Sequence, residues 1–258
     1  MSESVLDDAQ LASRLAIAAG EHLLKLREHG LLPANYLGAH GDRLANTLLT
    51  DLLRGHRPDD GLLSEEEAAD EARLSRRRVW IVDPLDGTRE YAEGRTDWAV
   101  HVGLVKDGIA DAACAVCLPA LGQTFSGAAP PVLPAALEGS LKILVSRTRA
   151  PRVAEQVAQR LGAQLIPMGS AGAKAMAVVR GEAHAYLHAG GQYEWDSCAP
   201  VGIALAAGLH ASRIDGSPCR YNQAEVFMPD VLICRPELAA SLLSTIAECL
   251  RHEEFHHA

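Results

Sequence analysis

Apolar residues recur every three or four positions along the first part of the chain, which predicts two amphipathic helices. The first is predicted over residues 6–29, where Gly30 supplies a C-terminal stop. A linker over residues 31–40, rich in turn-forming residues, separates it from a second helix predicted over residues 42–53. Asp42 would then lie in a first helical turn, where the helix dipole favours a carboxylate.

Short apolar runs predict strands in the next part of the chain. One run is expected to end at Asp83, because Pro84 cannot donate a hydrogen bond to a sheet. Two others flank Asp107-Gly108, which is the signature of a two-stranded hairpin. The strands predicted in this part are residues 61–64, 79–82, 98–106, 109–118 and 123–127.

Prolines make residues 128–139 loop-like, and we expect a boundary there between residues 1–138 and 139–258. Strands and helices alternate beyond it, and pattern alone predicts a mixed α and β fold. The predicted strands are 141–145, 164–168, 183–188 and 230–234, and the predicted helices are 151–161, 172–180, 196–207 and 236–251. The histidine-rich tail, residues 252–258, is interpreted as a frayed end.

Composition places the chain among soluble globular proteins, since 48% of its 258 residues are hydrophobic and 22% are charged. The net charge of −9 argues against a nucleic-acid polymer or an anionic membrane as partner. It does not exclude a phosphorylated substrate, because bound cations can reverse the local sign. The acidic start lacks the pattern of a signal peptide, and no apolar stretch is long enough to span a bilayer.

Six cysteines are present, and most lie among apolar or small residues, as buried thiols do. Cys114 and Cys117 form an isolated C-x-x-C without the second ligand pair that a zinc site requires. We therefore predict buried free thiols and a cytoplasmic protein.

The stretch from Asp83 to Thr88 carries the candidate chemistry. Asp83 and Asp86 lie three residues apart on a predicted turn, with the Leu85 carbonyl between them, and such oxygen ligands suit Mg²⁺. Gly87 and Thr88 then offer backbone N–H groups to a phosphate oxygen. For this fragment alone, an ordinary turn with solvated carboxylates is an equally good interpretation.

Three segments together resemble the Mg²⁺-dependent, lithium-sensitive phosphatases of the inositol monophosphatase family. They are Ser64-Glu65-Glu66, the strand followed by Asp83-Pro84-Leu85-Asp86-Gly87-Thr88, and Trp195-Asp196-Ser197-Cys198-Ala199-Pro200. The resemblance covers nearly the whole chain. It implies an α+β fold with a layered α/β/α/β/α sandwich and an active site shared by the two halves.

Further residues resemble the CysQ-type nucleotidase branch of this family. They are Arg89-Glu90-Tyr91, the Ser-x-Gly-x-Lys pattern of Ser170 to Lys174, and the run from Ala185 to Gly191. The resemblance implies hydrolysis of the 3′-phosphate of 3′-phosphoadenosine 5′-phosphate, and of its sulfated form, to AMP in sulfur assimilation. Inositol 1-phosphate or fructose 1,6-bisphosphate stays open as the alternative substrate.

The family's residue roles map onto matching positions. One Mg²⁺ is expected at Glu65, Asp83 and the Leu85 carbonyl, a second at Asp83, Asp86 and Asp196, and a weaker third at Asp42 and Glu65. The run before Asp42 lacks the family's usual threonine, which leaves the third position open. Inhibition by Li⁺ is also expected.

For catalysis, the resemblance gives Thr88 the role of orienting the attacking water, with its hydroxyl polarised by Asp42, and makes Glu65 the third catalytic group. The substrate contacts it implies are Gly87, Thr88, Arg89, Ser170, Lys174, His188 and Asp196. A helix cap is the structural alternative for Asp196, and a surface or merely structural position for Arg89, Lys174 and His188.

Three rival functions are less favoured. A phosphatase with an aspartyl nucleophile would have its carboxylates two residues apart and would leave the Trp195-Asp196 segment unexplained. A calcium-binding EF-hand needs a glutamate at the twelfth loop position, which the residues after Asp83 do not provide. An inactive scaffold would not need every expected carboxylate. A homodimer is possible, but no stretch requires one.

Overall fold

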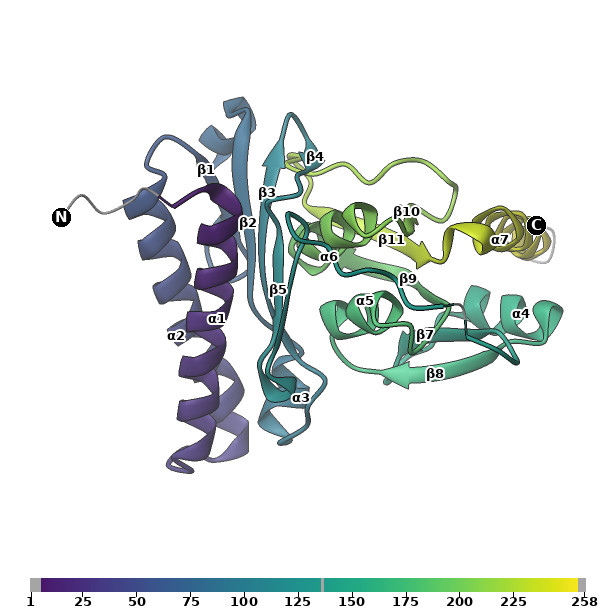
Figure 1. Ribbon diagram of the computed structural model, residues 1–258, viewed down its shortest axis with the longest axis horizontal. Coiled ribbons are helices and arrows are strands. Elements are labelled where there is room, and N and C mark those ends of the chain that lie inside the picture. The colour runs from purple at the N-terminus through teal and green to yellow at the C-terminus, as the bar shows by residue number, and fades with distance from the viewer. Residues whose placement is uncertain (1–5, 136, 255–258) are drawn as a thin grey trace.

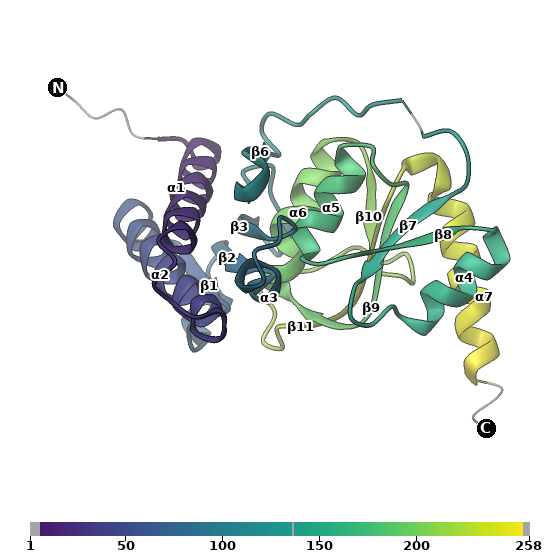
Figure 2. The same ribbon diagram turned by 90° about the horizontal axis from the view of Figure 1, so that it is seen from below.

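Helices and sheets alternate in five layers in the computed structural model, which describes residues 6–135 and 137–254 and, for residues 253 and 254, the backbone alone (Figure 1). Helices α1 (Asp8–Glu28) and α2 (Ala34–His56) cover the outer face of the first sheet. Figure 2 shows α5 (Ala171–Val179) and α6 (Glu194–Ala206) between the two sheets, with α4 (Arg152–Leu161) and α7 (Ala239–Glu254) beyond the second. The predicted α+β class and layered sandwich are confirmed.

The remaining elements complete the layers. The other helices are α3 (Thr88–Ala92), α4 (Arg152–Leu161), α7 (Ala239–Glu254) and the 3₁₀ turns η1 (Glu71–Ser75), η2 (Pro119–Leu121) and η3 (Pro236–Leu238). The strands are β1 (Gly61–Ser64), β2 (Arg78–Asp86), β3 (Ala99–Lys106), β4 (Ile109–Ala110), β5 (Ala115–Leu118), β6 (Gln123–Ser126), β7 (Lys142–Ser146), β8 (Gln164–Met168), β9 (Ala185–Tyr193), β10 (His210–Ser212) and β11 (Phe227–Cys234).

Each sheet mixes parallel and antiparallel pairs. The first has the order β1-β2-β3-β5-β6, with β4 paired to β3, and only its β1–β2 pair is parallel among the described residues. The second has the order β10-β11-β9-β7-β8, and β7 runs parallel to both of its neighbours. The carboxyl ends of the parallel strands β1 and β2 therefore lie side by side in the first sheet.

Strand β2 shows how the layers are built. Trp80 and Val82 pack into the core under α1 and α2, whereas Val79 and Ile81 pack into the core shared with α5 and α6. Both faces of the strand are buried because helices cover the sheet on both sides. This is why the sequence shows a continuous apolar run instead of alternation.

The predicted start of the second helix is wrong. Helix α2 begins at Ala34, directly after Pro33, and so includes most of the predicted linker. A proline is compatible with a helix start, and glycines at Gly38 and Gly41 are tolerated because α2 packs closely there on Thr88 and Leu85. Asp42 consequently lies inside the helix and not in its first turn.

Several predicted strand bounds are also wrong. Strand β2 does not stop at Asp83 but continues to Asp86, with its pairing to β3 displaced between these two residues. The strand predicted over residues 109–118 is split into β4 and β5, because Asp111 turns the chain by accepting a hydrogen bond from the Ala113 N–H at 2.9 Å. Strand β9 runs to Tyr193, five residues beyond the prediction, and β10 was not predicted.

The remaining predictions concern the cysteines, membrane-spanning helices, the C-terminal tail and the division into halves. All six cysteines are free and buried, as predicted. Within residues 6–135 and 137–254, no helix combines the length and the apolar character that a membrane crossing requires. Most of the tail interpreted as frayed lies outside the described residues. The division into residues 1–138 and 139–258 stays a prediction.

Candidate metal centre and substrate site

Glu65 and Asp83 come together because β1 and β2 are parallel. Ser64 pairs with Val82 at the end of the shared ladder, so the next residue of each strand is an acidic one. Asp83 is buried, and its Oδ1 accepts a hydrogen bond from the Leu85 N–H at 3.1 Å. The displaced pairing after Asp83 then brings Asp86 to the same side. Oxygens of Asp83 and Asp86 and a ring nitrogen of His101 lie within 4.8 Å of one another.

The carboxylate of Asp86 is stabilised by protein groups, which take the place of water around it. Its Oδ2 accepts hydrogen bonds from Ser170 Oγ at 2.5 Å and from the Gly172 N–H at 2.7 Å, and His101 Nε2 lies 3.1 Å away. Burial acts to raise the pKa of Asp86. The His101 charge and the hydrogen bonds outweigh it and lower the pKa to about 2. Asp86 is therefore ionised across the physiological pH range.

His101 was not predicted, because nothing in its strand sequence distinguishes it from a core residue. Its Nδ1 lies 3.0 Å from the Trp195 carbonyl oxygen and its Nε2 faces Asp86. Burial would lower the pKa of His101, but the Asp86 charge prevails and raises it. Nε2 makes no aligned hydrogen bond, but its 3.1 Å distance to Asp86 Oδ2 is that of an ion pair. We therefore interpret His101 as a charge partner of Asp86 within the acidic group.

The other carboxylates repel one another. Burial, then the charges of Glu65, Asp86 and Asp196, raise the pKa of Asp83 well above its usual value. Burial and the neighbouring charge of Asp86 raise the pKa of Asp196 to about 6. For Glu65, desolvation and the charges of Asp196 and Asp86 raise the pKa to about 7, although part of the residue stays exposed. The predicted ligands from both halves are thus close enough to interact.

Asp42 joins this group from α2. Its pKa is raised to about 8 by burial and by the charges of Glu65 and Glu66. Its Oδ1 is buried without a hydrogen-bond partner. Its Oδ2 lies 3.4 Å from Thr88 Oγ1, which also donates to the Leu85 carbonyl at 3.0 Å. The predicted contact between Asp42 and Thr88 is present, and it is long.

This donor set fits a hard divalent cation. Oxygen atoms dominate it, the buried negative charge is uncompensated outside Asp86, and one carboxylate oxygen lacks a partner. Burying several carboxylates without a counter-charge is costly, and a cation removes that cost. The acidic group can therefore hold metal.

Most predicted substrate contacts line one cavity of about 290 Å³. From the predicted set it includes Gly87, Thr88, Arg89, Ser170 and Lys174. The end of β7 and the two residues after it contribute further lining residues that the sequence did not reveal, since they belong to no recognisable motif; these are Ser146, Arg147 and Thr148. Arg147 also pairs with Glu90, at 2.9 Å, and with Asp97.

The weaker candidates differ in their surroundings. Lys174 is buried, and its Nζ donates to the Ser170 carbonyl at 2.6 Å and the Gly169 carbonyl at 3.3 Å, so it is not the solvent-facing helical lysine of the structural alternative. Arg89 is exposed and paired with Glu93 at 3.0 Å. His188 is not among the residues lining the cavity, and its Nε2 lies 2.9 Å from the Gly191 carbonyl oxygen.

Asp196 has both of its predicted roles available. One carboxylate oxygen accepts a hydrogen bond from the Tyr193 N–H at 2.6 Å, which caps the start of α6. Trp195, before it, stacks on Tyr193 with ring centroids 4.8 Å apart. The capping hydrogen bond uses one oxygen of Asp196 and holds the carboxylate at the edge of the acidic group. The two roles of Asp196 are therefore compatible.

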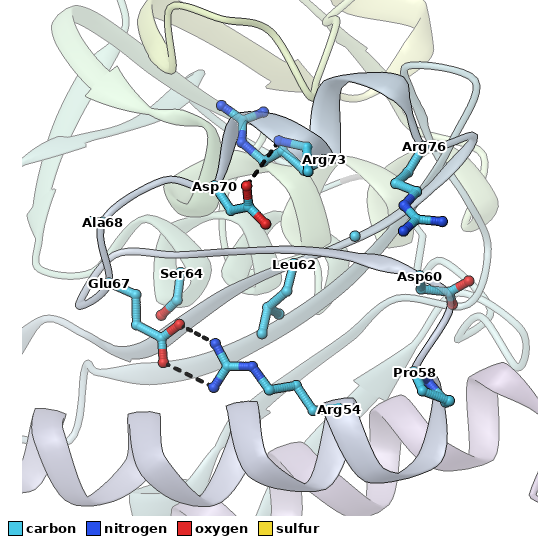
Figure 3. Close-up of a pocket in the computed structure, with 12 residues that line it drawn as sticks. Arg54, Pro58, Asp60, Leu62, Ser64, Glu67, Ala68, Asp70, Arg73 and Arg76 are labelled. Carbon is cyan, nitrogen blue, oxygen red and sulfur yellow. Dashed lines mark hydrogen bonds and ion pairs between the residues drawn. The ribbon is translucent and has the colours of Figure 1, made fainter.

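A separate cavity of about 280 Å³ lies beside the segment that follows Glu65 (Figure 3). Arg54 of α2 reaches across it to Glu67, with one N–O distance of 2.5 Å. None of the predicted metal ligands or substrate contacts lines this cavity. Its wall nevertheless includes the chain that positions Glu65.

Comparisons with known proteins agree with this geometry. The model of the inositol monophosphatase family matches residues 34–251. A 3′-phosphoadenosine 5′-phosphate phosphatase of Mycobacterium leprae is 50% identical, over 95% of this chain and 96% of its own. The protein of that name in Mycobacterium tuberculosis is 52% identical, over 90% and 91%. The 3′(2′),5′-bisphosphate nucleotidase CysQ of Escherichia coli is 28% identical, over 72% and 80%.

Solved structures show the same fold. The crystal structure of CysQ from Bacteroides thetaiotaomicron superposes with a TM-score of 0.76 at 23% identity, covering 89% of this chain and 97% of that one. An inositol monophosphatase from Zymomonas mobilis superposes with a TM-score of 0.77 at 21% identity, covering 95% and 99%.

Proposed function

Because the chain belongs to the inositol monophosphatase family, we propose that it is a Mg²⁺-dependent phosphomonoesterase that removes the 3′-phosphate of 3′-phosphoadenosine 5′-phosphate and yields AMP. Two mycobacterial relatives that are about half identical along nearly their whole length carry the name of that activity. The substrate is thus a small nucleotide bisphosphate. The sulfated nucleotide is a further candidate.

One observation carries the proposal: carboxylates from both halves of the chain meet around Asp83. The charges of Glu65, Asp86 and Asp196 all act on this buried side chain. Such a cluster is unfavourable in a folded protein unless something positive occupies it. The proposed ligands are Glu65, Asp83, the Leu85 carbonyl, Asp86 and Asp196, with Asp42 and Glu65 for a third ion.

Divalent cations bound there would supply positive charge to the phosphate and its leaving oxygen and lower the pKa of a coordinated water. The protein's own part is to position the reacting groups. Gly87 and Thr88 line the cavity where the phosphate would bind, and their backbone N–H groups are the proposed donors. The Thr88 hydroxyl, which contacts both Asp42 and the Leu85 carbonyl, is proposed to orient the attacking water.

The rest of the substrate would occupy the cavity beside β7. Arg89 and Arg147 line its wall and pair there with carboxylates, which the second phosphate of a nucleotide bisphosphate would replace as their partner. Lys174 also lines the cavity and adds positive charge, although its ammonium group donates hydrogen bonds to main-chain carbonyls. Ser170 is held by Asp86, which connects this wall directly to the acidic group. His188, which does not line this cavity, stays a proposed substrate contact.

The test compares three substrates on one preparation. We expect kcat/KM for 3′-phosphoadenosine 5′-phosphate to exceed that for inositol 1-phosphate and fructose 1,6-bisphosphate by at least about 10-fold, or about 1.4 kcal/mol of transition-state binding. Phosphate release is measured with Mg²⁺ and with a chelator. A preference for either sugar phosphate would refute the substrate assignment. Phosphate release that is unchanged by the chelator would refute the proposed dependence on Mg²⁺.

Several finer points belong to the same proposal. Two or three Mg²⁺ ions per site, inhibition by Li⁺ and a cytoplasmic location are proposed, the last because all six cysteines are free thiols. A homodimer is compatible with the chain, and sedimentation would decide its oligomeric state.

A further inference from the structure

We propose that a hydrogen-bonded network between a buried arginine and a buried glutamate sets the separation of Glu65 and Asp196, the candidate ligands that opposite halves of the chain contribute. The inference rests on the proposed function, because this separation matters only to a bound metal. We name it the Arg73–Glu194 network, and it consists of Arg73, Glu194, Asn222 and Gln223.

Arg73 forms the end of the network on the Glu65 side. It belongs to η1, which follows the acidic segment after β1, and it is only 3% exposed. Its Nη1 donates to Asn222 Oδ1 at 2.7 Å and its Nη2 to the Gln223 carbonyl at 2.9 Å. Asn222 Nδ2 donates back to the Arg73 carbonyl at 3.0 Å. The segment that carries Glu65 is therefore bound to a loop of the other half.

Glu194 forms the end on the Asp196 side, two residues before it in α6. It is 1% exposed, and its two carboxylate oxygens accept the N–H groups of Asn222 at 2.6 Å and Gln223 at 2.7 Å. A buried cation and a buried anion thus hold the same two loop residues from opposite sides. Charge-assisted hydrogen bonds of this kind fix direction as well as distance.

The Glu65 segment has a second attachment that does not reach Asp196. Glu67 receives hydrogen bonds from Arg54, at 2.5 Å, and from Asn46, at 3.4 Å, both on α2. In Figure 3, Arg54 points across the cavity to Glu67, whereas Arg73 points away from them both. One attachment therefore holds the segment to α2, and the Arg73–Glu194 network holds it to the helix of Asp196.

The experiment uses Asn222→Gly and Arg73→Gln, with Arg77→Gln as the matched control. Asn222 has a positive φ of 60°, which glycine adopts readily, so its substitution removes both side-chain hydrogen bonds without backbone strain. Arg77 is an exposed neighbour whose side chain pairs with Asp107. Titration calorimetry of the metal-free full chain with Mg²⁺ and with Mn²⁺ gives the metal Kd. We expect the Kd to rise about 10-fold in both variants.

KM for the nucleotide at saturating Mg²⁺ should stay near that of the unaltered protein, as should every property of Arg77→Gln. A folded Asn222→Gly protein with unchanged metal Kd would overturn the inference, even if its Tm fell, since the network would then be merely structural. If the unaltered protein binds no metal, the inference and the proposed function both fall. If it binds metal without hydrolysing the nucleotide, only the proposed function falls.

Discussion

Asp83 and Asp86 are separated by two residues and lie in opposite electrostatic surroundings. Asp86 accepts hydrogen bonds from Ser170 and Gly172, and the charge of His101 outweighs burial and lowers the pKa of Asp86 to about 2. Asp83 is surrounded by other carboxylates, which together with burial raise its pKa. Both are expected to bind metal, yet only Asp86 also holds the two halves of the chain together. Substitution should therefore separate their contributions to activity and to stability.

We predict that Asp83→Asn and Asp86→Asn both abolish most phosphatase activity but change the metal-free protein in opposite directions. Asp83→Asn removes a repelled charge and should raise the Tm of that protein. Asp86→Asn leaves His101 buried without its counter-charge and should destabilise the fold by about 3 kcal/mol. Urea unfolding in a chelator measures both effects. If the two substitutions changed the free energy of unfolding equally, the electrostatic surroundings of Asp83 and Asp86 would not be opposite.

At the scale of elements, α2 reaches the site because glycines let it approach α3 and β2. A Cβ added at Gly38 would lie 2.8 Å from Thr88 Cγ2, and one at Gly41 would lie 2.9 Å from Leu23 Cδ2 and 3.0 Å from Tyr91 Cε1. Helical propensity opposes two glycines so close together, and tertiary packing outweighs it. The close approach is what brings Asp42 within reach of Thr88.

Gly38→Ala should therefore impair catalysis although alanine favours a helix. The added methyl displaces Thr88 or the whole of α2, and we expect kcat to fall about 10-fold or more, because small misplacements at a site are costly. Gly55→Ala in the same helix is the control, since nothing lies within 4 Å of its added Cβ. Steady-state kinetics on both variants checks this. A Gly38→Ala enzyme as active as Gly55→Ala would contradict the proposed role of this helix.

At the scale of the whole molecule, the site is an accumulation of like charge between two packed halves. Arg147 joins them beside Asp86 by pairing with Glu90 and Asp97, and the Arg73–Glu194 network joins them beside Asp196. Between these connections the carboxylates repel one another. The folded protein therefore depends on protons or cations at its centre.

This predicts an unusual pH dependence of stability. The folded-state pKa values of Asp42, Glu65 and Asp196 are raised to about 8, 7 and 6, whereas the unfolded values lie near 4. The folded state therefore holds more protons than the unfolded state between these limits, and the stability of the metal-free protein falls as pH rises through them. Saturating Mg²⁺ should reverse the trend, because protons and cations compete for the same oxygens.

Thermal unfolding at about pH 5.5 and at about pH 8, with Mg²⁺ and with a chelator, measures this dependence. The Tm of the metal-free protein should be lower at the higher pH, and Mg²⁺ should raise the Tm by more at that pH. An equal rise in Tm at both pH values would mean that the cation binds outside the acidic group. Arg77→Gln, which removes an exposed ion pair with Asp107, serves as a control for general electrostatic effects.

The sequence alone determined most of the helices and strands, because the core elements follow simple periodicity. Its short motifs, through their resemblance to a family, also indicated the layered fold and the candidate carboxylates. Tertiary structure decided the rest. Where α2 begins, why β2 continues past Pro84, and that His101, Arg147, Arg73 and Glu194 support the site all depend on contacts between residues distant in the chain. Such contacts leave no local pattern, since the energy that selects them comes from packing and charge pairing in the folded state.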